Sequence, residues 1–141
     1  MDKITIIKSL ESITNQLGSY NFEIISINDG STDASEDLIN NFKKDTDLNI
    51  IHSWQEDMGF RASRSRNNAI FKSSGDYIVL IDGDTILHTN FVKDHIENAE
   101  SGFFVQGFRA LLSEKQTKKA LAGKKIDFSF FSSELKNRKN L

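Results

Sequence analysis

The first helix is predicted from the spacing of apolar residues near the start of the chain. Residues 4–17 carry apolar side chains three or four positions apart, which places them on one face of an amphipathic helix. These side chains are Ile4, Ile7, Leu10, Ile13 and Leu17. The helix therefore has an apolar face to bury against the rest of the fold.

Four later segments are short and mostly apolar, with several β-branched or aromatic residues, and are predicted to be strands. They are residues 22–27, 48–53, 76–82 and 103–109. Helices are predicted between them at 33–44, 61–74 and 90–99, and residues 110–141 are expected to be mostly helical and polar. Asp33 and Glu36 have the spacing of a helix cap for the first of these. Alternating strands and helices indicate an α/β fold with a mainly parallel sheet flanked by helices.

Length and composition narrow the possible classes of protein. A chain of 141 residues suits one domain with one core. It contains no cysteine, which excludes disulfides and thiolate metal sites. Its longest strongly apolar run, Tyr77–Ile81, is far shorter than the ~20 residues of a membrane span. The start of the chain lacks the pattern of a signal peptide, so a cytoplasmic location is expected.

Charge is distributed unevenly along the chain. Residues 1–108 carry 9 Lys and Arg against 17 Asp and Glu, whereas residues 109–141 carry 9 against 3. The basic end is either a solvated helix surface or a contact with phosphates or an anionic membrane surface. Because the remainder is acidic, a nucleic-acid partner is not expected, even though Arg61, Arg64 and Arg66 lie close together.

Polar clusters follow three of the predicted strands. They are residues 28–31, the loop 54–60 and residues 82–84. In open α/β sheets, ligands bind beyond the carboxyl ends of the strands. Three polar clusters at one sheet edge therefore indicate a ligand site there.

Asp82 and Asp84 flank a single glycine, Gly83, directly after the third strand. Two carboxylates on one side of an extended chain repel each other unless a cation or a proton lies between them. Hard oxygen ligands favour Mg²⁺ or Mn²⁺, which are usually shared with substrate phosphates. The alternative is a solvated Asp-Gly turn. Dehalogenase-like phosphatases also end a strand with two aspartates, but in the order Asp-x-Asp-Gly-Thr, which this sequence does not have.

The first cluster contains Asp29, Gly30 and Ser31. A carboxylate at this strand end can accept a hydrogen bond from a base N–H or a ribose hydroxyl, or it can form an Asx turn and a helix cap. Arg66 and Asn67 are expected near the start of the next helix, aimed at the sheet edge or exposed. His88 follows Asp84 closely enough to be a further candidate, whereas His52 and His95 are interpreted as ordinary fold residues.

Taken together, the segments "FEIISINDGSTD", "WQEDMGFRASRSRNNAI", "SSGDYIVLIDGDTILHTNFV" and "GFFVQGFRALLSE" resemble the family 2 glycosyltransferases of GT-A fold. The form "WQEDxGFRASxxRN" followed by "DGD" is most similar to the bacterial subgroup that builds lipopolysaccharide, lipooligosaccharide or capsule glycans. The resemblance covers nearly the whole chain. It implies a GT-A, Rossmann-like sheet and an inverting transfer of sugar from a nucleotide donor, with UDP-sugar expected, to a glycan or lipid-linked glycan acceptor.

The resemblance also implies roles for individual residues. Asp29, with Gly30 and Ser31, would read the uracil or ribose, and Asp84 would hold Mn²⁺ or Mg²⁺ with Asp82 as its partner. Arg66 and Asn67 would lie behind the nucleotide pocket. The loop 54–61 would line the donor pocket, with contacts to sugar or phosphate from its polar residues Glu56, Asp57 and Arg61.

Two parts of the family pattern are not found in this sequence. Family members begin with a strand that precedes the first helix, and they carry an acceptor half with a catalytic carboxylate. Residues 1–110 are therefore expected to be the donor-binding part of a GT-A domain, and residues 111–141 the start of the acceptor side. A chain that is incomplete as an enzyme is expected, and a non-catalytic nucleotide-binding or interaction module is the alternative.

Overall fold

The computed structural model describes residues 3–16, 18–31, 35–123 and 135–136 of the chain. The chain divides into two compact units, which we describe separately. One unit is Gly18–Asp82, and the other combines Met1–Leu17 with Gly83–Leu141. The boundary between them falls between Asp82 and Gly83, inside one of the predicted polar clusters.

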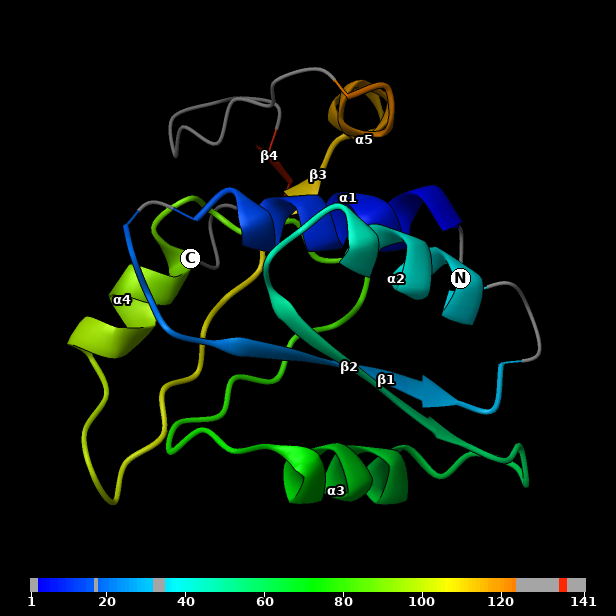
Figure 1. The fold of residues 1–141 in the computed structure, drawn as a ribbon. Coiled ribbons are helices and arrows are strands. Elements are labelled where there is room, and N and C mark those ends of the chain that lie inside the picture. The colour runs from blue at the N-terminus through cyan, green and yellow to red at the C-terminus, as the bar shows by residue number, and fades with distance from the viewer. Residues whose placement is uncertain (1–2, 17, 32–34, 124–134, 137–141) are drawn as a thin grey trace. The chain divides into compact units, whose positions relative to one another are not determined.

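The unit Gly18–Asp82 is built on two parallel strands (Figure 1). β1 (Glu23–Asp29) pairs with β2 (Asn49–Gln55), with Glu23 opposite Asn49 and Asp29 opposite Gln55. Helix α2 (Ser35–Lys44) connects the strands, and helix α3 (Ala62–Lys72) follows β2. The two helices lie on opposite faces of the strand pair. This confirms the predicted α/β arrangement with parallel strands flanked by helices.

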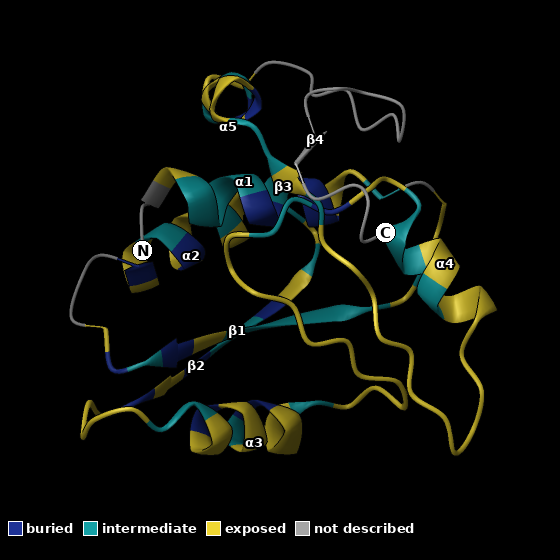
Figure 2. Cartoon of the chain, turned by 180° about the vertical axis from the view of Figure 1, so that it is seen from behind, coloured by how far each residue is buried: buried dark blue, intermediate teal, exposed yellow. Residues whose placement is uncertain are grey.

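Each of these elements has a local reason to form. Ile39 in α2, Ile50 in β2 and Ala69 in α3 are buried, so both helices and β2 contribute apolar side chains to the interior of this unit (Figure 2). Helix α2 also carries acidic residues in its first turn and Lys43 and Lys44 in its last, an arrangement that suits the helix dipole. The cap expected from Asp33 lies outside the described residues.

The second unit begins with helix α1 (Lys3–Thr14). As predicted, Leu10 and Ile13 on its apolar face are buried, whereas Ile4 is half exposed; Leu17 lies outside the described residues. The unit also contains α4 (Phe91–Glu97), α5 (Glu114–Leu121) and a short antiparallel pair, β3 (Leu111–Leu112) with β4 (Leu135–Lys136). Helix α1 packs against α5. The helix expected at 90–99 is thus present, and α5 supports the helical prediction for part of 110–141.

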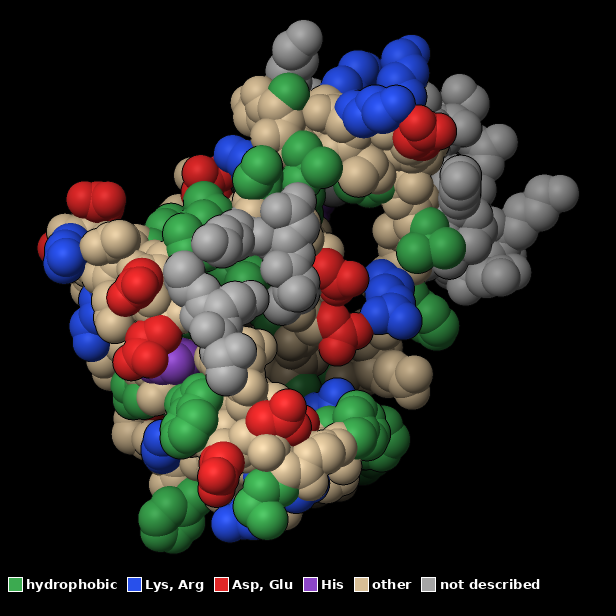
Figure 3. All heavy atoms as spheres, turned by 90° about the vertical axis from the view of Figure 1, so that its right-hand side faces the viewer, with side chains coloured by type: hydrophobic (Ala, Val, Ile, Leu, Met, Phe, Trp, Pro, Cys, Tyr) green, Lys and Arg blue, Asp and Glu red, His purple; other side chains and the backbone are tan. Residues whose placement is uncertain are grey.

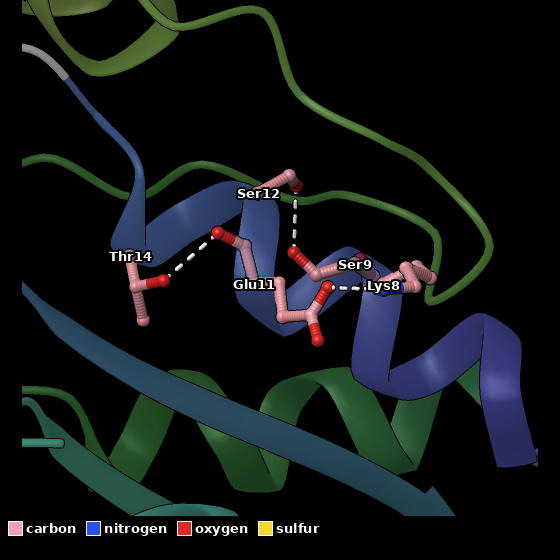
Figure 4. Close-up of polar contacts among 5 residues, drawn as sticks. All are labelled: Lys8, Ser9, Glu11, Ser12 and Thr14. Atoms are coloured by element: carbon pink, nitrogen blue, oxygen red, sulfur yellow. Dashed lines mark hydrogen bonds and ion pairs between the residues drawn. The ribbon is translucent and has the colours of Figure 1, made fainter. Parts of the chain in front are cut away.

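Polar side chains of α1 hold the segment that follows Asp84. Ser9 Oγ donates to the carbonyl of Thr85 at 2.9 Å, and the N–H of Leu87 donates to Ser12 Oγ at 3.0 Å. Ser12 Oγ in turn donates to the carbonyl of Ser9 at 2.6 Å (Figure 4). Gln16, just after the end of α1, accepts from the N–H of Val92 at 2.9 Å. These contacts satisfy backbone groups that have no strand partner to bond with.

Two strand predictions are wrong. Neither 76–82 nor 103–109 forms a strand in the structure. The apolar residues 77–81 are each 38–58% exposed, and Phe103, Phe104 and Phe108 are more exposed still. Hydrophobic side chains accordingly reach the surface (Figure 3). β-propensity describes how well a residue fits a pleated, half-buried surface. Among the residues that the structure describes, β1 and β2 pair with each other and offer no third strand such a surface.

Within the described part of the chain, no helix is long and apolar enough to cross a membrane. Part of the basic end, residues 124–134 and 137–141, lies outside the described residues. Contact of the basic end with phosphates or a membrane surface stays a prediction. The division of function at residue 110 is likewise a prediction.

Candidate functional site

The ends of β1 and β2 bring Asp29 and Gln55 together. These residues are direct partners in the parallel register, and Gln55 Nε2 donates to Asp29 Oδ1 at 2.5 Å. The other carboxylate oxygen, Oδ2, accepts from the backbone N–H of Arg61 at 3.4 Å. Asp29 is therefore held at the carboxyl edge of the strand pair by one side chain and one backbone group. This is the edge where the sequence predicts a ligand site.

One hydrogen bond and one steric constraint shape the turn after Asp29. The N–H of Ser31 donates to Asn28 Oδ1 at 2.8 Å, a local side-chain-to-backbone hydrogen bond across the turn. Gly30 adopts a left-handed conformation with φ of +85°, and a Cβ there would lie 2.5 Å from the Cα of Asp57. The loop after β1 therefore touches the backbone of the loop after β2. Ser31 itself is exposed.

The loop after β2 is closed by its own polar groups. The guanidinium of Arg61 donates from Nη2 to the carbonyl of Glu56, and the carboxylate of Asp57 accepts from the N–H of Gly59 at 3.1 Å. Arg61 Nε is buried and has no hydrogen-bond partner among the described residues. Glu56 and Asp57 are exposed, as are Met58 and Phe60 from the same loop. Trp54 is exposed too, but it lies in β2, so the loop begins later than predicted. The loop thus presents both acidic and apolar side chains beside Asp29.

Helix α3 contributes a residue that the sequence analysis missed. Asn68 Nδ2 donates to Gln55 Oε1 at 3.1 Å, so Asn68 and Gln55 both belong to the hydrogen-bond network around Asp29. Arg66 and Asn67, the residues predicted for this region, are exposed on α3. The position of Gln55 beside Asp29 could have been found from the sequence. Two parallel strands of equal length that end in Asp and Gln place these two side chains as neighbours.

The Asp82–Asp84 segment is an exposed turn. All three of its residues are exposed, with the turn at Gly83 and Asp84. Within the described part of the chain, no group of three or more His, Cys, Asp or Glu side chains is arranged to hold a metal ion. Among the described residues, Asp82 and Asp84 are therefore the two carboxylates that the sequence pattern offers to a metal here.

The histidines differ in their surroundings. His52 is nearly buried and lies 3.8 Å from Glu36, and its Nε2 is 3.4 Å from the amide of Asn28. His95 packs edge-on against Phe91 with ring centroids 4.5 Å apart. Both contacts agree with a role in the fold. His88 is exposed, and its Nδ1 accepts from the N–H of Asn90 at 3.3 Å.

Comparison with known proteins assigns the family. The family model described as "Glycosyl transferase family 2" matches residues 4–140, so the chain belongs to this family. An uncharacterized glycosyltransferase of Rickettsia bellii is 37% identical over 99 residues, which is 70% of this chain and 14% of that protein. Glycosyltransferase GlyA of Streptococcus pneumoniae is 35% identical over 65% of this chain and 14% of its own length.

A third relative, the poly-beta-1,6-N-acetyl-D-glucosamine synthase of Staphylococcus aureus, is 38% identical over 54% of this chain and 18% of its own length. The chain thus spans a small part of the curated relatives that it matches. No solved structure matches the chain significantly.

Proposed function

We propose that this chain is the donor-binding part of a glycosyltransferase that takes sugar from a nucleotide sugar, with UDP-sugar as the expected donor. The observation that carries the proposal is the position of Asp29 at the carboxyl end of β1, held by Gln55 and by the N–H of Arg61. An ionised carboxylate only accepts hydrogen bonds, and each of its oxygens has a further lone pair. Asp29 can therefore still accept from a base N–H or a ribose hydroxyl.

The neighbouring polar residues supply candidate contacts for the rest of the donor. Gly30 and Ser31 form the turn beside Asp29, where a ribose or base would approach. Glu56, Asp57 and Arg61 come from the loop after β2 and are candidates for contact with sugar or phosphate. Arg66 and Asn67 lie on the same helix as Asn68 and are candidates for the back of the nucleotide pocket.

A divalent cation fits the chemistry of Asp82 and Asp84. Both are carboxylates, two positions apart and exposed, and Mg²⁺ is commonly held by one or two carboxylates together with substrate phosphates. Mn²⁺ or Mg²⁺ bound there would stabilise the negative charge on the departing nucleoside diphosphate. Asp84 would be the principal ligand and Asp82 its partner. Gly83 leaves room for the backbone to approach the donor.

For the acceptor we propose a class of molecule and not an individual compound. The acceptor would be a glycan or lipid-linked glycan in bacterial surface polysaccharide synthesis, which is supported by the motif resemblance and by the name of the Staphylococcus aureus relative. Inversion at the anomeric carbon requires a base that takes the proton of the acceptor hydroxyl. We assign that base to no residue of this chain. Contact of the basic end with a membrane surface would bring the enzyme to a lipid-linked acceptor.

Calorimetric titration of UDP into the purified chain, with and without Mn²⁺, tests the proposal. We expect binding that weakens at least about tenfold without Mn²⁺ or in Asp84→Asn, and also in Asp29→Asn. Asp45→Asn removes an exposed carboxylate after α2 and is the matched control. UDP binding that is unchanged without Mn²⁺ and in Asp84→Asn would favour the alternative, a nucleotide-binding module without transfer chemistry. No binding of UDP to the folded wild-type chain would overturn the proposed donor site.

A further inference from the structure

The side-chain amide of Gln55 has one orientation in which its NH₂ group faces the Asp29 carboxylate, and this orientation is the favourable one. Its neighbour on one side is the carboxylate of Asp29, which can only accept, so the NH₂ group must face it. The carbonyl oxygen Oε1 then faces Asn68 and accepts from Nδ2 at 3.1 Å. A reversed amide would place Gln55 Oε1 against the Asp29 carboxylate and lose that hydrogen bond, and it would keep the bond with Asn68 only if the amide of Asn68 reversed as well.

Burial strengthens this preference. Gln55 is 9% exposed, so water has little access to replace a lost hydrogen bond. Leaving a buried polar group without its partner costs about 1–3 kcal/mol. The amide therefore stays in the orientation that the Asp29 carboxylate requires, with Asn68 as the donor to its oxygen, and it does so without a ligand.

The network joins three elements of one compact unit. Asn68 lies on α3, Gln55 ends β2 and Asp29 ends β1, and α3 packs against both strands. The sequence motif pointed to Asn67, but the residue that reaches the network is its neighbour Asn68. Asn68 acts on Asp29 only through Gln55.

We infer that Gln55 and Asn68 are positioning residues, which orient the carboxylate of Asp29 for the nucleotide before the nucleotide arrives. This rests on the proposed role of Asp29 in donor binding. Holding a binding group in its productive rotamer lowers the entropy cost of binding. The inference predicts that Asn68 controls nucleotide affinity although its amide is bonded to Gln55 rather than to Asp29.

Asn68→Asp replaces the hydrogen-bond donor that faces the Gln55 amide with an acceptor. A carboxylate at position 68 cannot donate to Gln55 Oε1 and instead accepts from Nε2, so the amide is drawn away from Asp29. We expect UDP affinity in the presence of Mn²⁺ to fall at least about tenfold. The ¹⁵N–¹H signals of the Gln55 side-chain amide should shift in the same variant without UDP. Asn40→Asp makes the same change at an exposed position of α2 and should do neither.

Gln55→Glu supplies a signature that a purely structural role would not give. A protonated Glu can donate to Asp29 as Gln does, whereas an ionised Glu repels it. Within the described part of the chain, the charged residues that hydrogen-bond to the Gln55 side chain are Asp29, through its carboxylate, and Arg61, through its carbonyl. As the pH rises from about 5 to about 8, the UDP affinity of Gln55→Glu should therefore fall relative to that of the wild type.

The outcomes separate this inference from the proposed function. Wild-type UDP binding with unchanged affinity in Asn68→Asp would overturn the positioning role and leave the donor site standing. Absence of UDP binding by the wild type would overturn the donor site. The ¹⁵N–¹H signals of the Gln55 side-chain amide would then still test the orientation of that amide. A shift of these signals in Asn68→Asp supports the orientation described here, and unchanged signals refute it.

Discussion

Gly30 and Asp57 approach so closely that a side chain at position 30 would collide with the backbone of Asp57. A Cβ on Gly30 would lie 2.5 Å from the Cα and 2.7 Å from the N of Asp57, and Gly30 has a φ of +85°. The contact joins the loops that follow β1 and β2. Close approach of the two loops beside Asp29 therefore depends on a residue without a side chain.

We expect Gly30→Ala to destabilise the unit Gly18–Asp82 by about 2–4 kcal/mol, because it adds a clash to the cost of a left-handed backbone. Gly59→Ala is the matched control, since Gly59 has a φ of +88° but a Cβ at that position would have no other atom within 4 Å. That variant should lose only about 1–2 kcal/mol. Urea unfolding measures both, and equal losses would contradict the close contact.

Ser12 is predicted to hold the segment after Asp84 through a buried hydrogen bond. Its Oγ accepts from the N–H of Leu87 at 3.0 Å, and Leu87 is buried. Ser12→Ala leaves that N–H without a partner, so we expect a loss of about 1–3 kcal/mol in unfolding free energy. The amide of Leu87 should also exchange with solvent faster.

Thr14→Ala is the control for Ser12→Ala, because Thr14 Oγ1 donates to the carbonyl of Glu11 at an exposed position on the same helix (Figure 4). It should change stability by less than about 0.5 kcal/mol. If both variants behave alike, the Ser12–Leu87 bond does not contribute as the structure indicates.

Gln116 is a buried amide whose replacement should stabilise the protein. It is 1% exposed, and neither Nε2 nor Oε1 has a hydrogen-bond partner among the described residues. Methionine has a similar shape without the polar atoms, so Gln116→Met should raise the unfolding free energy by about 1–2 kcal/mol. Thermal unfolding compares it with Gln106→Met at an exposed position, which should stay within about 0.5 kcal/mol. A loss of stability in Gln116→Met would mean that the amide has a polar partner, such as water.

Glu23 should make stability depend on acid pH. Its carboxylate accepts from the N–H and the hydroxyl of Ser74, at 2.6 Å and 2.9 Å, and these bonds lower the pKa of Glu23 from its ordinary value of 4.5. A lowered pKa in the folded state means that the bonds contribute at neutral pH. The contribution is lost as the pH falls below about 4.5 and through the folded-state pKa.

Glu23→Gln removes this titration, so its stability should fall less than that of the wild type when urea unfolding is repeated from neutral to acid pH. Ser74→Ala keeps the backbone donor and should retain part of the pH dependence. Identical pH profiles for all three proteins would show that Glu23 does not contribute. The effect is expected to be small because Glu23 is exposed to solvent.

Some elements could be predicted because their signal is local. Leu10 and Ile13 repeat at helical spacing, and the helix forms with both residues buried. The parallel pairing of β1 and β2 follows from two β-branched runs joined by a helix. The strands expected at 76–82 and 103–109 failed because a strand exists only where another backbone pairs with it, which the composition of one segment does not determine.

The sequence by itself determined the family, the parallel strands with their helices, and the position of Asp29 at a strand end. It determined these because hydrophobic spacing and motif order are properties of the chain alone. Only the tertiary structure decided that Gln55 and Asn68 bond in series to Asp29 and that Gly30 touches Asp57. Hydrogen-bond direction and steric contact depend on where separate segments meet in space, and no spacing along the chain specifies that.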